Sequence, residues 1–191
     1  MPNPLLAAIA AGDVTLAQAA LAAGADPDTR DAEGATALMH AAHAGNLALV
    51  RALLAAGADV HVADSGGWTA LHKAVHDADA DRGHPEVVQA LVDAGADVEA
   101  RIGYGIRPLM LAAGYGEAAV AEVLLHAGAD VFARNDGGLT ALMMVKEKFY
   151  VDVINLLTEA ERDAGAGEGS CATKNAPGSS VVTFRKPLAQ S

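Results

Sequence analysis

The chain has 191 residues, of which 52% are hydrophobic and 4% aromatic, and its formal net charge at pH 7 is −11. This composition suits one elongated helical core, and the negative charge argues against a nucleic-acid partner because phosphate backbones would be repelled. The single cysteine, Cys171, excludes an intramolecular disulfide and suits a reducing, cytoplasmic compartment, and no apolar run is long enough to span a membrane.

Two short motifs recur along the chain at a nearly fixed spacing. The first, Ala-Gly-Ala-Asp, occurs at 23–26, 56–59, 94–97 and 127–130. The second, Thr-Ala-Leu or its equivalent, begins at Thr36, Thr69, Arg107 and Thr140. Successive copies of each motif are 33, 38 and 33 residues apart. Both markers therefore indicate a repeated unit of 33 residues with one longer copy.

The predicted elements follow one another in the same order in each unit. The hydroxyl of Thr36 is placed to cap a first, Ala-rich helix, and Gly45 marks the turn that follows. A second helix carries an apolar stripe at helical spacing within 49–54. It ends at Gly57, because a helix commonly stops at a residue with positive φ. A tight turn, as at 64–67, then leads to the next unit.

A turn-helix-helix unit of this length resembles the ankyrin repeat, and Thr69-Ala70-Leu71-His72-Lys73-Ala74 is close to that family's signature hexapeptide. The resemblance implies an all-α ankyrin-repeat solenoid, with stacked helix-turn-helix units joined by β-turn or hairpin fingers. We expect an ankyrin repeat domain over 1–163, with about five units. The expected units are 1–30, 31–63, 64–101 with a five-residue insert, 102–134 and 135–163.

The two ends of the array depart from the pattern. The first unit lacks the turn and threonine that open the others, and the last has Phe149 where the helix-linking glycine is expected. Such changes suit capping repeats, because an end unit has no neighbour to cover it. Residues 164–191 begin Gly- and Ser-rich and predict a flexible C-terminal tail. For its apolar and basic end, 181–186, there are two alternatives to a flexible chain. The segment could pack back on the acidic array, or it could serve as a docking peptide for a partner.

The insert in the third unit carries three alternating carboxylates, Asp77, Asp79 and Asp81. A calcium-binding loop that began at Asp77 would need glycine at its sixth position and glutamate at its twelfth. Those positions hold Arg82 and Val88. The sequence therefore favours a lengthened, solvated turn over a cation site, with a partner-contacting loop as the other alternative.

Four histidines fall on two neighbouring first helices, at His40, His43, His72 and His76. His72 and His76 are four residues apart, but the glutamate of the zinc-protease motif is missing between them. The resemblance gives His72 a structural, hydrogen-bonding role. We therefore expect no metal, no cofactor and no catalytic residues, so the chain is predicted not to be an enzyme. A metal-dependent activity at these histidines remains the second alternative function.

The resemblance also implies where partners bind, since fingertips and the exposed side of the first helices form a concave groove in such arrays. Aromatic residues at these positions favour recognition, because Trp and Tyr are enriched in binding hot spots. The candidate partner-binding residues are Trp68, Tyr104, Ile106, Tyr115, Leu139, Glu33, His43, His76, Asp77 and Lys148. Alternatively, Trp68 and Ile106 pack on neighbouring turns. Arg30, Arg101 and Arg134 recur at one phase of the unit and could form a rim of the groove, but the sequence favours solvated surface charge for them.

The sequence as a whole predicts a monomeric, cytoplasmic, non-catalytic module that binds a partner protein. The acidic charge favours a partner with a basic and apolar surface. The first alternative is a stoichiometric inhibitor, of the immunity-protein kind, that blocks a partner enzyme with the same groove or with the acidic insert.

Overall fold

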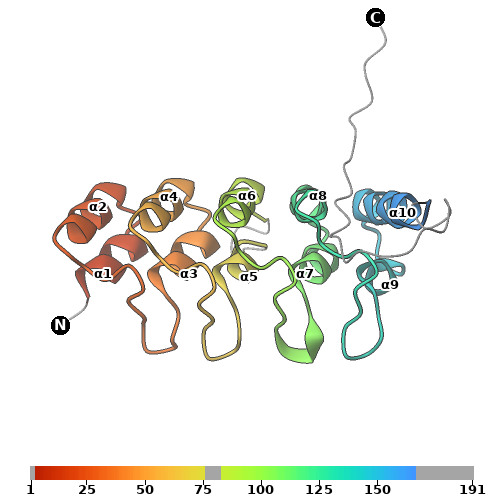
Figure 1. The fold of residues 1–191 in the computed structure, drawn as a ribbon, viewed down its shortest axis with the longest axis horizontal. Coiled ribbons are helices and arrows are strands. Elements are labelled where there is room, and N and C mark those ends of the chain that lie inside the picture. The colour runs from red at the N-terminus through yellow and green to blue at the C-terminus, as the bar shows by residue number, and fades with distance from the viewer. Residues whose placement is uncertain (1–2, 76–82, 167–191) are drawn as a thin grey trace, which may run out of the picture.

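The computed structural model of the chain describes residues 3–75 and 83–166. Over these residues it forms pairs of short helices stacked side by side (Figure 1). The pairs are α1 (Pro4–Ala10) with α2 (Val14–Ala22), α3 (Ala37–His43) with α4 (Leu47–Ala55), α5 (Ala70–Val75) with α6 (Pro85–Asp93), α7 (Pro108–Tyr115) with α8 (Ala118–His126), and α9 (Ala141–Val145) with α10 (Val151–Ala166). The expected all-α solenoid of about five units is confirmed.

The helices form two rows (Figure 1). We call α1, α3, α5, α7 and α9 the inner helices and α2, α4, α6, α8 and α10 the outer helices. Between one pair and the next, the chain forms a long loop that projects past the inner row, away from the outer row (Figure 1). We number these loops fingers one to four; they span 30–36, 63–69, 101–107 and 134–140. Isolated antiparallel bridges close fingers one to three, and finger three also contains the 3₁₀ turn η1 (Gly103–Gly105).

The predicted caps form at the start of two inner helices. The hydroxyl oxygens of Thr36 and Thr140 each accept a backbone N–H from three residues later, at 3.3 Å. Satisfying such an N–H, which has no partner within the helix, stabilises a helix by about 1 kcal/mol. At Thr69 the hydroxyl instead lies 2.9 Å from Nδ1 of His72.

Small residues on the inner helices let neighbouring repeats approach closely. Ala41, Ala42, Ala74, Ala112 and Ala113 are all fully buried. The predicted apolar stripe of the outer helices faces the same core, where Leu49, Leu53, Val88, Leu91, Val120 and Leu124 are buried. The core is therefore a continuous layer along the array, to which each repeat contributes one segment.

The turns between inner and outer helices show why the last repeat departs from the pattern. A Cβ at Gly45 would overlap the imidazole of His84, which belongs to the next repeat. At the corresponding place in the last repeat, Phe149 is 97% exposed. A large side chain is tolerated there because no described repeat follows to cover it.

The C-terminal helix continues past the boundary expected at residue 163, since α10 ends at Ala166. The rest of the expected tail lies outside the described residues, as do Asp77, Asp79 and Asp81 of the insert. Within the described residues, no helix has the length and apolar character needed to cross a lipid bilayer.

Candidate functional site

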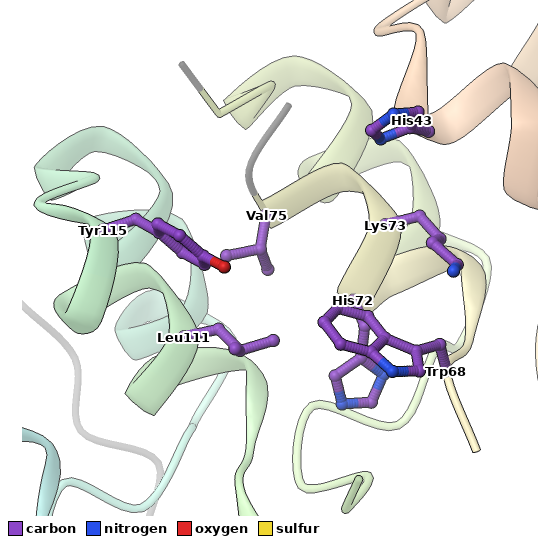
Figure 2. A pocket seen from close by; sticks show the side chains of 7 residues that line it. All are labelled: His43, Trp68, His72, Lys73, Val75, Leu111 and Tyr115. Atoms are coloured by element: carbon purple, nitrogen blue, oxygen red, sulfur yellow. The ribbon is translucent and has the colours of Figure 1, made fainter. Parts of the chain in front are cut away.

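A hollow of about 200 Å³ opens between the inner helices of the second, third and fourth repeats (Figure 2). We call it the central hollow. Its lining residues are His43, Trp68, His72, Lys73, Val75, Leu111 and Tyr115. Leu111 and Tyr115 project from α7 towards the side chains of α5 and finger two (Figure 2). The hollow thus brings together His43, Trp68 and Tyr115, three of the candidates expected from the sequence.

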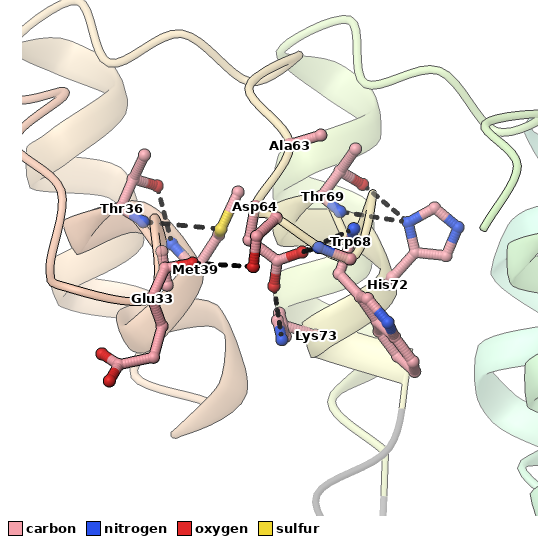
Figure 3. Close-up of polar contacts among 12 residues, drawn as sticks. Glu33, Thr36, Met39, Ala63, Asp64, Trp68, Thr69, His72 and Lys73 are labelled. Atoms are coloured by element: carbon pink, nitrogen blue, oxygen red, sulfur yellow. Dashed lines mark hydrogen bonds and ion pairs between the residues drawn. The ribbon is translucent and has the colours of Figure 1, made fainter. Parts of the chain in front are cut away.

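A network of polar contacts holds one wall of the central hollow in place (Figure 3). Asp64 accepts the N–H groups of Gly66 and Trp68 at 2.9 Å and pairs with Lys73 Nζ at 3.0 Å. Burial raises the pKa of Asp64, but the hydrogen bonds from Lys73, Trp68 and Gly66 outweigh it and keep the pKa below its usual range. The ammonium of Lys73 also lies 5.0 Å from the centre of the Trp68 ring. The half-buried indole is therefore fixed before any partner binds.

His72 supports this wall from beneath. Its imidazole meets the Trp68 ring edge-on, with 5.9 Å between ring centres. Nδ1 accepts the N–H of Thr69 at 3.3 Å, and Nε2 lies 3.2 Å from the carbonyl oxygen of Ala100. These partners assign the neutral tautomer with its proton on Nε2. Burial lowers the pKa of His72 to about 4, despite the hydrogen bond to Ala100. The residue is a structural histidine, not a groove ligand.

The opposite wall carries exposed aromatic surface next to a cation. Tyr115 is 49% exposed although it lies at the end of α7. Lys148 donates from Nζ to the carbonyl oxygen of Gly114 at 2.6 Å, and its ammonium lies 5.5 Å from the centre of the Tyr150 ring. Lys148 is therefore held at Gly114, the residue before Tyr115, and lies beside the hollow without lining it.

Finger three differs from the other fingers. In fingers one, two and four, an Asp or Asn side chain accepts the N–H groups two and four residues later. These residues are Asp31, Asp64 and Asn135. Finger three has Ile102 at this position and turns through Tyr104 and Gly105, with φ of 61° and 68°. Tyr104 is 86% exposed, so the finger holds an aromatic side chain in solvent on a strained backbone.

Replacing Tyr104 with asparagine is expected to raise the free energy of unfolding by about 0.5–1 kcal/mol, because Asn tolerates positive φ better than Tyr. The change also creates Asn-Gly, the preferred sequence for a turn with positive φ at both central residues. Urea denaturation of Tyr104→Asn beside the native chain measures this. A loss of stability would show instead that the ring packs against the array.

A model of ankyrin repeats matches residues 5–102 and 78–168, which together span nearly all described residues. The chain belongs to the ankyrin repeat family. Ankyrin repeats are generally protein-protein interaction modules, and the family is typically non-catalytic. A search of curated proteins found no match to this chain.

The remaining candidates occupy several different places in the ankyrin array. Glu33 and Leu139 are exposed on fingers one and four, outside the central hollow. Ile106 is half-buried against the core and bridges to Ile102, so it contributes to finger three instead of to the hollow. His76 and Asp77 lie outside the described residues.

Lys73, Val75 and Leu111 also line the hollow, although they are not among the residues expected from the sequence. A signal for two of them was present, because Lys73 and Leu111 occupy the same position in successive ankyrin repeats, four residues after the helix-capping position. From this position Lys73 contacts Asp64 and Trp68 on the finger before its helix, and Leu111 projects back towards the preceding repeat (Figure 2). Val75 gave no such signal, since it is fully buried and only contributes to the floor of the hollow.

The three described histidines of the region do not converge. His40 Nε2 pairs with Asp31 at 2.6 Å on finger one, His72 is buried under Trp68, and His43 is exposed at the edge of the hollow. Among the described residues, no three side chains of His, Cys, Asp or Glu are grouped as metal ligands would be.

Proposed function

We propose that this ankyrin array is a non-catalytic module that binds a partner protein at the central hollow and the neighbouring fingertips. The observation that carries the proposal is the meeting of Trp68, Leu111 and Tyr115, from two successive repeats, around one open hollow. Aromatic and apolar side chains around a concave site are typical anchors for a partner's side chain.

The wall of the hollow supports binding without a large rearrangement. Trp68 is held by its backbone hydrogen bond to Asp64, by the Lys73 ammonium and by the edge of His72. Fixing a side chain before binding reduces the entropy lost on association. The exposed ring of Tyr104 on finger three extends the same surface, and its strained turn is consistent with selection for contact rather than for stability.

The inhibitor alternative uses the same surface and differs only in what binding does to the partner. An assay of the partner's own activity in the stoichiometric complex separates inhibition from scaffolding. The proposal also keeps a monomeric protein and a cytoplasmic location, and the single cysteine in the sequence favours that location. Metal-dependent activity is not part of it, because His40 and His72 are each committed to a separate structural partner.

The test is affinity capture from a lysate of the source organism, followed by titration of the purified partner against variants. Trp68→Ala/Tyr115→Ala is expected to weaken binding at least about tenfold, because truncating hot-spot aromatics costs more than 1 kcal/mol each. Glu86→Ala/Gln89→Ala, on exposed positions of outer helix α6, is the matched control and should bind as the native chain does.

Circular dichroism must show that both double variants are folded. A partner that binds the Trp68→Ala/Tyr115→Ala variant with native affinity would exclude the central hollow as the binding site. Loss of binding in the outer-helix control alone would move the site to the opposite row of helices.

A further inference from the structure

Charge is divided unequally between the two sides of the array. Every described Lys and Arg residue except Arg51 and Arg162 lies on a finger, on an inner helix or in the turn that follows one. The described Asp and Glu residues divide the other way. On the finger side they are Asp13, Asp31, Glu33, Asp64, Glu117, Asp136 and Glu147, and all the others lie on the outer helices or on the loops that follow them.

The net charge of −11 therefore does not describe the groove. On the finger side the described cations and carboxylates are equal in number, whereas the outer side is strongly acidic. Asp77, Asp79 and Asp81 lie outside the described residues and are not part of this comparison. At physiological ionic strength charges are screened beyond about 8 Å, so a bound partner responds mainly to the side it touches.

Two of these cations flank the aromatic surface of the central hollow. Lys73 lies on the Trp68 side, and Lys148 lies on the Tyr115 side through its hydrogen bond to Gly114. Each lysine ammonium has three N–H donors. Lys73 gives one to Asp64 and Lys148 one to a backbone carbonyl, so donors remain on both for a ligand acceptor.

A third cation stands on the adjacent fingers. Arg101 on finger three donates to Asp136 on finger four at 2.6 Å, and both side chains are more than half exposed. An ion pair this exposed contributes little to stability. The guanidinium retains further N–H donors that can bind a second carboxylate beside Tyr104.

We propose that the central hollow binds a segment of a partner protein that carries an apolar or aromatic side chain flanked by Asp or Glu. The apolar side chain enters between Trp68, Leu111 and Tyr115, and the carboxylates meet Lys148, Lys73 and Arg101. This reverses the basic partner expected from total charge, and it rests on the proposed protein-binding function. The acidic outer helices face away from the bound segment and restrict it to the finger side.

The experiment selects a random dodecapeptide library displayed on phage against the full-length chain. The enriched peptides are synthesised and titrated against the native chain, Trp68→Ala/Tyr115→Ala, Lys148→Met and Arg51→Met. Arg51→Met is the matched control, because it removes the same unit of charge from an exposed position on outer helix α4. Lys148 is chosen over Lys73 because its exposed side chain leaves no partly buried carboxylate unpaired.

We expect the enriched peptides to pair Asp or Glu with an apolar residue. Lys148→Met should then raise the dissociation constant about fivefold, as for an accessible ion pair, and Arg51→Met less than twofold. Replacing the peptide's carboxylate by its amide should weaken binding to the native chain by the same factor and leave binding to the Lys148→Met variant almost unchanged. This comparison identifies the carboxylate as the partner of Lys148.

Two other outcomes distinguish failure of the acidic-partner inference from failure of the proposed function. In the first, the peptides lose binding to Trp68→Ala/Tyr115→Ala but are basic or uncharged, or their affinity changes equally in Lys148→Met and Arg51→Met. This result would overturn the acidic-partner inference and leave the proposed function intact. Selected peptides that bind Trp68→Ala/Tyr115→Ala as tightly as the native chain, or a library that yields no binder, would count against both.

Discussion

Replacing Gly83 with alanine is expected to lower the free energy of unfolding by roughly 3 kcal/mol, the cost of overpacking a close-packed interior. Gly83 is buried where the third repeat meets the fourth. A Cβ there would overlap the carbonyl oxygen of Val75 and lie 2.6 Å from Cγ2 of Val120. The first of these atoms is backbone, so the clash cannot be relieved by rotating a side chain.

Gly114→Ala is the matched control for this change. Gly114 lies within helix α7, and a Cβ added there meets no atom within 4 Å. Alanine is favoured over glycine in a helix interior, so this variant should gain about 0.5–1 kcal/mol. Urea denaturation of both variants gives the two values. If Gly83→Ala were as stable as Gly114→Ala, the close packing between the third and fourth repeats would be incorrect.

His72 is expected to make a large contribution to the pH dependence of the unfolding free energy between its unfolded-state and folded-state pKa values. Its pKa is lowered by burial to about 4 in the folded chain, from 6.5 in a solvated histidine. Well above pH 6.5 the residue is neutral in both the folded and the unfolded chain, so its titration does not affect stability there. As the pH falls from 6.5 towards 4, the unfolded chain binds a proton that the folded chain excludes, so stability declines by roughly 3 kcal/mol at most. Below pH 4 this contribution changes no further.

The residues at the same position in other repeats suggest a control variant for His72. Met39, Met110 and Met143 occupy the position of His72 in other repeats, and Thr36 donates its N–H to the Met39 sulfur at 3.4 Å as Thr69 does to His72. His72→Met should therefore fold, with a modest loss at pH 7 because the Ala100 carbonyl loses its partner.

The quantity to measure is the difference in unfolding free energy between the native chain and His72→Met at several pH values from 7.5 to 4. It should favour the native chain at neutral pH and shrink or reverse at acid pH, while carboxylate titrations largely cancel in the difference. A difference that is independent of pH would mean that His72 is accessible to protons in the folded chain.

The repeat spacing was sufficient to predict the fold, because the recurring residues act locally. Thr36 caps its own helix, and the apolar stripe around Leu49 and Leu53 packs inward wherever the unit is stacked. Register between repeats follows from the constant length of the unit. The long third unit could be placed for the same reason, since its markers on either side keep their phase.

The candidate site was only partly predictable, because it depends on how side chains of different repeats meet. The repeat phase placed Trp68 and Tyr115 on the groove, but not the contacts of Trp68 with Lys73 and His72 that make it half-buried. Ile106 has the same phase as Trp68 and packs against the core instead, since finger three turns differently. Total charge was also a poor guide to the partner, because it averages a finger side with balanced charges and strongly acidic outer helices.

The most direct test of the central claim is photo-crosslinking from single positions in the full chain. A benzophenone side chain at Tyr115, on the central hollow, is compared with one at Gln89, exposed on outer helix α6. The account predicts that the captured partner crosslinks from position 115 and not from position 89. Crosslinking from position 89 alone would place the partner on the outer helices and contradict the groove as the site of recognition.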